Sequence, residues 1–136
     1  MIRSVLTVIV GILAGSVAVW VLEMAGHHFY PPPVGVDLQN VEAFKQYVAG
    51  APAGMLLSVL TAWAGGAFVG GLVAALLSER HRGVHALAVG ALQTVLALVQ
   101  FAVIPHPLWF MVLGVTIFMP FAGLGGLLVG REPEVA

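Results

Sequence analysis

Hydrophobic residues along this 136-residue chain fall into four long runs, which shorter polar stretches separate. The runs cover about residues 4–24, 53–78, 84–104 and 108–130. Each approaches or exceeds the roughly 20 residues that a helix needs to cross ~30 Å of hydrocarbon. Because the runs are continuous rather than alternating, they do not fit the strands of a membrane barrel. The pattern predicts an all-α integral membrane protein: a single domain, residues 1–136, whose four transmembrane helices form two in–out hairpins.

A different pattern occupies residues 30–52, which form the predicted outer loop between the first two runs. The prolines of residues 31–33 favour an extended backbone. Asp37 is expected to cap a short helix, which Gly50 and Pro52 would end. The apolar residues that share one face of this segment are Val41, Phe44, Tyr47 and Val48. We predict a short amphipathic helix on the membrane surface or over the mouth of the bundle, with a plain connector as the alternative.

Composition supports the membrane assignment and narrows the range of functions. The chain is 60% hydrophobic and 8% charged, whereas soluble domains are about 25% charged. Its net charge of −1 argues against a nucleic-acid-binding face. The absence of cysteine excludes disulfides, thiolate ligands and a cysteine nucleophile.

The basic residues favour one orientation in the membrane. Four spans place both termini on one side, and that side would hold Arg3, Arg80, Arg82 and Arg131. The other side would hold Lys45. Because basic loops stay in the cytoplasm, we predict a multi-pass membrane protein with both termini cytoplasmic.

Small residues recur four apart in three of the runs. These pairs are Gly11 with Gly15, Gly66 with Gly70, and Gly126 with Gly130. Such spacing lets helix backbones approach closely in lipid. The pairs therefore predict helix packing, either inside one chain or between copies in a homo-oligomer or a larger membrane-protein complex.

Two other features concern packing within the spans. Pro120 lies inside the fourth run, where it removes a backbone hydrogen bond to the carbonyl of Thr116 and predicts a kink. The Thr116 hydroxyl is expected to compensate partly for that loss. Trp20 and Trp63 are expected to be packing residues.

The candidate chemistry gathers near the outer ends of the helices. Glu23 ends the first span, and His27 follows one helical turn later. The groups expected at the same membrane depth are Glu23, His27, His28, Gln100 and His106. Gln93 and Gln100 lie seven residues apart on one helix face and predict either an interhelical hydrogen bond or a polar-lined ligand cavity.

Three interpretations of the outer cluster remain open. In the first, Glu23 pairs with His27 or a neighbouring histidine and fixes the first helix. In the second, the cluster binds zinc, copper or iron, or two histidines hold a haem. The metal ligands would then be Glu23, His27, His28 and His106. The third is a proton or ion path, because an acid inside the membrane is a functional candidate by default. We expect no cofactor, with a metal or haem as the alternative.

Several motifs resemble those of a group of small, uncharacterised bacterial four-helix membrane proteins. The resemblance rests on E-x-x-G-H-x-x-Y-P-P-P from Glu23 to Pro33 and on P-H-P-x-W-F from Pro105 to Phe110. It covers nearly the whole chain and implies a bacterial inner membrane and the four-helix fold. The group often carries a second acid where this chain has Asn40, and His28 is particular to this chain. The resemblance implies no activity.

These observations predict a non-enzymatic integral membrane protein, acting as an oligomeric or accessory subunit with a docking surface on its outer loop. The alternative is a small transporter or binding protein with a ligand or metal site on the outer face. The ligand or ion candidates are Glu23, His27, Gln93, Gln100 and His106. No nucleophile–base pair is present, so no catalytic residue is predicted.

Overall fold

The computed structural model describes residues 1–130, which form five helices and no strand. The helices are α1 (Ile2–Phe29), α2 (Val41–Ala49), α3 (Ala53–Leu77), α4 (Arg82–Val103) and α5 (Leu108–Leu128). All except α2 are long and apolar enough to cross a membrane. Arg131, one of the four arginines behind the predicted orientation, lies outside the described residues.

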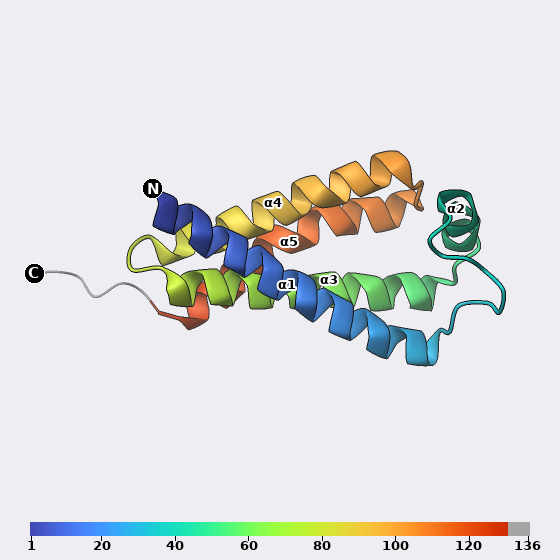
Figure 1. The fold of residues 1–136 in the computed structure, drawn as a ribbon, viewed down its shortest axis with the longest axis horizontal. Helices are drawn as coiled ribbons and strands as arrows, with labels where there is room; N and C mark the ends of the chain where they lie inside the picture. Colours follow the sequence, from blue (N-terminus) through green and yellow to red (C-terminus); the bar gives the residue numbers. More distant parts are fainter. Residues whose placement is uncertain (131–136) are drawn as a thin grey trace, which may run out of the picture.

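The four long helices run side by side, and α3 is the central one (Figure 1). It contacts α1, α4 and α5, whereas α1 contacts α3 and α4 but has no close contact with α5 in the described chain. The N-terminus and the end of α5 lie at one end of the bundle, which also carries Arg3, Arg80 and Arg82 and is called the basic end below. The opposite end carries α2, which lies across the direction of the bundle (Figure 1).

The helix α1 is longer than predicted. It continues past the apolar run to Phe29, so Glu23 and His27 both lie within the helix. Tyr30 follows, and its ring lies against Gly54 at the start of α3, where no side chain stands in the way. The first aromatic residue after α1 therefore connects that helix to the beginning of α3.

Glycines allow α1 and α3 to cross with their backbones in contact. A Cβ atom added at Gly11 would lie 2.8 Å from the carbonyl oxygen of Gly70, and one at Gly15 would lie 2.7 Å from that of Gly66. Any side chain here would push the helices apart. These two predicted glycine pairs lie against each other inside one chain.

The remaining glycine pair behaves differently. Gly126 packs against Ala86 of α4, where an added Cβ would lie 2.6 Å from the Ala86 methyl group. Gly130 lies just beyond α5, with a φ of +81°, and within residues 1–130 no atom lies within 4 Å of an added Cβ. Its left-handed backbone follows the helix end as glycine commonly does, so Gly130 is not a packing contact.

The bundle core has an aromatic half and a small-residue half. Trp63 of α3 is 6% exposed and contacts Phe101, Phe110 and Phe118 of the neighbouring helices, with ring centroids 5.9, 5.4 and 5.5 Å away. Towards the basic end, alanine and glycine replace the aromatic rings between the helices. The packing prediction is wrong for Trp20, which is 62% exposed on the surface of α1.

The segment between α1 and α3 is organised by a cap that differs from the predicted one. The side-chain oxygen of Asn40, not Asp37, accepts the first free N–H groups of α2, from Glu42 at 3.0 Å and Ala43 at 3.1 Å. The Asp37 carboxylate accepts the N–H of Gln39 at 3.0 Å and stabilises the preceding turn. Asn40 forms the cap because it immediately precedes the helix, where a short acceptor side chain reaches these N–H groups.

At Pro120, the expected role of the Thr116 hydroxyl is not found. Residues on both sides of Pro120 are helical, and the predicted kink stays a prediction. The Thr116 hydroxyl donates to the carbonyls of Val112, at 2.9 Å, and Leu113, at 3.1 Å. The carbonyl that lacks a donor because Pro120 has no N–H is that of Thr116, one turn later. The hydroxyl therefore does not compensate for the missing proline donor.

Candidate functional site

The candidate site lies at the α2 end of the bundle, where α1, α3 and the α4–α5 connection meet. Glu23 is half-buried on α1, and its carboxyl group interacts with the indole N–H of Trp63 and lies near His27. Three residues beyond Glu23, Gly26 packs against the Ser58 side chain of α3. A Cβ atom added at Gly26 would lie 3.1 Å from the Ser58 hydroxyl oxygen. The acid at the end of the apolar run therefore faces the central helix rather than lipid.

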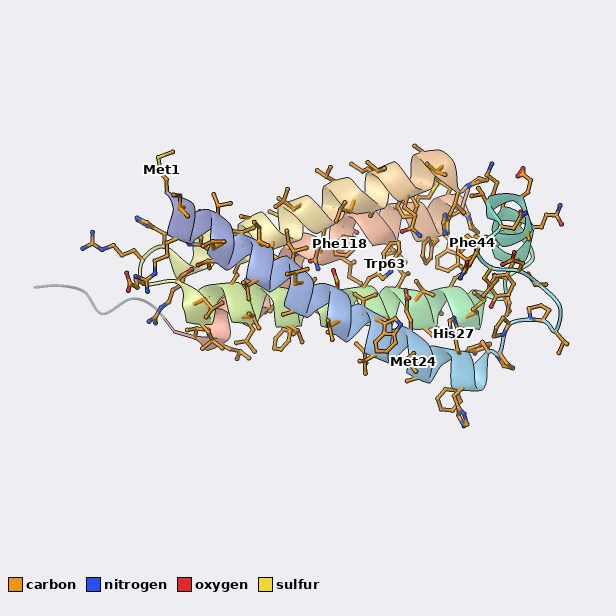
Figure 2. The ribbon with its side chains drawn as sticks, viewed as in Figure 1. Met1, Met24, His27, Phe44, Trp63 and Phe118 are labelled. Carbon is orange, nitrogen blue, oxygen red and sulfur yellow. The ribbon has the colours of Figure 1, made fainter. Side chains whose placement is uncertain are left out.

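His27 and His28 lie at the surface. His27, one turn after Glu23, is exposed beside the end of α1 (Figure 2). His28 points elsewhere on the helix and places the edge of its ring against Phe29, with centroids 5.5 Å apart. The ion pairs formed within residues 1–130 are Arg3–Glu79 and Glu42–Lys45, so Glu23 and His27 do not form the predicted direct pair in this structure.

His106 is held by aromatic rings. It stacks on Phe110 with centroids 4.9 Å apart and planes 12° apart, and it meets Phe101 edge-on at 5.2 Å. Its Nδ1–H donates to the Ile104 carbonyl at 2.7 Å. Burial lowers the pKa of His106, and the Ile104 bond opposes that shift only partly. The ring is thus a packed, neutral part of the turn between α4 and α5.

These placements do not assemble the predicted metal cluster. In the part of the chain that the structure describes, no three histidine, aspartate or glutamate side chains lie close enough together to hold one ion. Glu23, His27, His28 and His106 share one end of the bundle but have separate surroundings.

Gln93 and Gln100 have different surroundings although they share a face of α4. Gln100 is half-buried near the α2 end. Gln93 is buried where α1, α3 and α4 meet, and its Nε2 would lie 2.9 Å from a Cβ added at Gly15. Its Oε1 is buried without a hydrogen-bond partner within the described residues. The predicted interhelical hydrogen bond is therefore not formed by this oxygen.

Two features of the structure, one at the site and one at the basic end, were not predicted from the sequence. One is the aromatic cluster around Trp63, which lies with Phe118 in the middle of the bundle (Figure 2). Its signal was the presence of aromatic residues at similar depths in three predicted spans. The other is the role of Arg82, which was counted only as a charge. Its guanidinium donates to the carbonyls of Ser78 and Val129, both at 3.4 Å, and links the α3–α4 turn to the end of α5.

Comparison of the chain with models of known families, with curated proteins and with solved structures found no match. The resemblance to small bacterial four-helix membrane proteins therefore stays a prediction that rests on the two quoted motifs. The function has to be argued from the site itself.

Proposed function

We propose that this chain is a non-enzymatic integral membrane protein that acts as a subunit of a larger assembly, with residues 30–52 as its docking surface. The supporting observation is the contrast between two regions. Glu23 and His106 in the bundle are engaged in packing. Residues 30–52 form a capped, folded segment beyond the bundle, and much of it faces outward.

The docking surface is proposed from apolar side chains that are exposed in the described chain. Val34 is fully exposed at the tip of the segment, and Val41 is 54% exposed at the start of α2. In the described chain, α2 makes no close backbone contact with the other helices. Exposed apolar groups on an ordered segment outside the spans are a common feature of protein interaction sites.

The proposed orientation places this segment on the outer face of a bacterial inner membrane. Arg3, Arg80 and Arg82 lie at the end opposite α2, and Lys45 is the basic side chain of α2. The positive-inside rule assigns the basic end to the cytoplasm. Partners of residues 30–52 would then approach from outside, on a membrane protein or in the adjoining compartment.

Native mass spectrometry of the protein released gently from its own membrane tests the assembly. We expect a mass larger than one chain, either several copies or a complex with another membrane protein. The absence of cysteine allows a single photoreactive crosslinker to be attached at Val34→Cys, with Glu79→Cys at the basic end as the matched control. A crosslinked partner from position 34 alone supports docking. A monomer without crosslinks from position 34 would contradict the proposal.

The second candidate, a small transporter or binding protein with an outer ligand or metal site, is favoured by one observation. Glu23 is an acidic group within a spanning helix, and such groups are often functional. The Glu23→Ala variant distinguishes the two candidate functions. If Glu23 is structural, the yield of folded protein falls because the half-buried carboxyl group no longer packs beside Trp63. If Glu23 binds a ligand, the fold persists, and a metal or small-molecule mass disappears from the native spectrum.

A further inference from the structure

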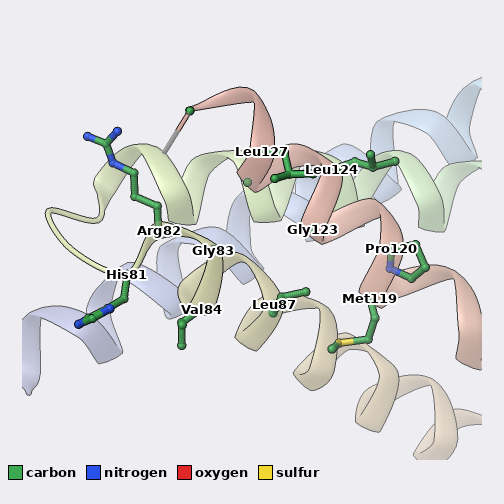
Figure 3. A pocket seen from close by; sticks show the side chains of 12 residues that line it. His81, Arg82, Gly83, Val84, Leu87, Met119, Pro120, Gly123, Leu124 and Leu127 are labelled. Carbon is green, nitrogen blue, oxygen red and sulfur yellow. The ribbon is translucent and has the colours of Figure 1, made fainter. Parts of the chain in front are cut away.

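A groove runs between α4 and α5 at the basic end of the bundle, away from the candidate site. It encloses about 820 Å³. Its walls are mostly apolar and include Leu87 of α4 and Met119 and Leu124 of α5 (Figure 3). His81 and Arg82 lie at the end formed by the α3–α4 turn (Figure 3). The groove thus has a long apolar body and one basic end.

The groove is open because glycines take the place of side chains along it. An added Cβ at Gly123 would lie 3.4 Å from Leu87 Cδ2, which is ordinary contact, and one at Gly83 would have no atom within 4 Å. By contrast, Gly71 and Gly125 in the α3–α5 contact would clash with backbone atoms. Gly83 and Gly123 therefore leave space that residues 1–130 do not fill.

The charges at the mouth of the groove favour an anion. Glu79, an acid of this end, forms an ion pair with Arg3 at 2.8 Å. Arg82 donates only to two carbonyls at the long distance of 3.4 Å, and within residues 1–130 neither Arg80 nor Arg82 forms an ion pair. His81 has a left-handed backbone, with a φ of +57°, and is exposed, and its ring points away from the Arg82 guanidinium (Figure 3). A phosphate at Arg82 would gain charge-assisted hydrogen bonds that the carbonyls do not provide.

We propose that this groove binds one phospholipid with an anionic headgroup. Its phosphate lies at Arg82, and an acyl chain lies along Leu87, Met119 and Leu124. Basic pockets at the cytoplasmic ends of helices bind anionic headgroups, and the apolar body distinguishes a lipid from a free phosphate ion. The proposal needs the chain to be in a membrane with its basic end inside, but it does not need the assembly proposed above.

The test is lipid binding to the detergent-purified full chain, followed by native mass spectrometry. We expect phosphatidylglycerol to bind one per chain and more tightly than phosphatidylcholine. Arg82→Gln should weaken phosphatidylglycerol binding about tenfold or more, as expected for loss of a hydrogen bond to a charged group. Gly123→Leu should weaken both lipids by filling the apolar body. Arg3→Gln, at the same end but paired with Glu79, is the matched control and should leave binding unchanged.

Three outcomes would overturn the proposal. If the two lipids bind equally and Arg82→Gln does not change their binding, the groove has no site for an anionic headgroup. Inorganic phosphate that binds alone and displaces phosphatidylglycerol would indicate a free-anion site. A dimer mass that Gly123→Leu abolishes would make the groove a contact between copies. If Gly123→Leu fails to fold, Gly83→Leu fills the same groove at a position with open space, and its failure to weaken lipid binding would equally count against the proposal.

Discussion

At the scale of single residues, the α1–α3 crossing depends on the absence of side chains. Gly15 lies where α3 and α4 both approach α1. Its nearest neighbour is the backbone carbonyl of Gly66, which cannot rotate away as a side chain can. A methyl group there has to separate two helices, whereas one at Gly83 enters open space.

Gly15→Ala is therefore expected to lower the free energy of unfolding by about 1–3 kcal/mol, in the range of overpacked cores. Gly83→Ala should leave it unchanged or raise it slightly, since alanine restricts the unfolded chain. Thermal unfolding in detergent measures both. Equal melting temperatures for the two variants would mean that the crossing is not as close as the structure describes.

Gln93 offers a second test at this scale. Its buried Oε1 has no partner within the described residues, and an unpaired amide oxygen costs free energy without contributing a bond. Gln93→Leu should keep or raise the melting temperature. A clear fall would indicate that the amide oxygen is bonded in the folded protein, by water or by a ligand.

His106 predicts a dependence of stability on pH. Its folded pKa lies below the unfolded value of about 6.5, so the unfolded chain takes up protons first as the pH falls. The contribution of His106 to stability is complete above about pH 6.5 and is lost as the pH falls through the lowered folded pKa.

The melting temperature should thus fall between pH 7.5 and pH 5, and less steeply in His106→Phe, which keeps a ring between Phe101 and Phe110 without a titrating group. His28→Gln, an exposed histidine, is the control and should retain the wild-type slope. An unchanged slope in His106→Phe would assign the effect to other groups.

At the scale of elements, α2 is tied to the rest of the chain mainly through Val48, the buried residue of this helix. Its start is fixed by the Asn40 cap, and α2 makes no close backbone contact with another described helix. Loss of an asparagine cap costs roughly 1 kcal/mol, a large loss for a helix of nine residues. Local and global stability should therefore respond separately.

Asn40→Ala should speed hydrogen exchange of the amides of residues 41–49 by about fivefold while the four long helices keep their protection. Hydrogen exchange with mass spectrometry measures this. Asp37→Ala, which removes only the bond to Gln39, is the control. Faster exchange in α3 as well would mean that α2 is coupled to the bundle.

The predicted elements differ from the observed ones mainly at their ends. Long apolar runs identified the four helices because lipid offers no hydrogen-bond partners, so a spanning backbone has to satisfy its own N–H and C=O groups, as a helix does. They could not locate the end of α1, because Ala25 to Phe29 extend the helix without extending the apolar run. Asp37 and Asn40 are both good caps, and the choice depends on where the helix begins. Trp20 could not be distinguished from Trp63 because lipid and protein core are equally apolar.

At the scale of the molecule, the candidate site was predicted only as a region. The shared depth of Glu23, His27 and His106 followed from helix length, and these residues do lie at one end. What surrounds each of them depends on the rotation of α1 about its axis and on the aromatic contacts of the turn at His106, and no spacing in a single sequence specifies these. The groove between α4 and α5 escaped prediction because glycines indicate close packing and open space equally well.

The orientation of the whole chain is directly testable because it contains no cysteine. In intact cells, a membrane-impermeant maleimide should label Gln39→Cys, next to α2, but not Glu79→Cys at the basic end. Opening the cells should make position 79 reactive. Labelling of position 79 and not position 39 in intact cells would reverse the orientation.

The central position of α3 has a consequence for biosynthesis. During translation α1 emerges first, and its main partner, α3, comes next of the four long helices, so the two can pair while the ribosome is still making the remainder. The helix α4 then meets contacts on both, and α5, which has no close backbone contact with α1 in the described chain, arrives last against α3 and α4. Each long helix after α1 therefore finds at least one of its packing partners already synthesised when it enters the membrane.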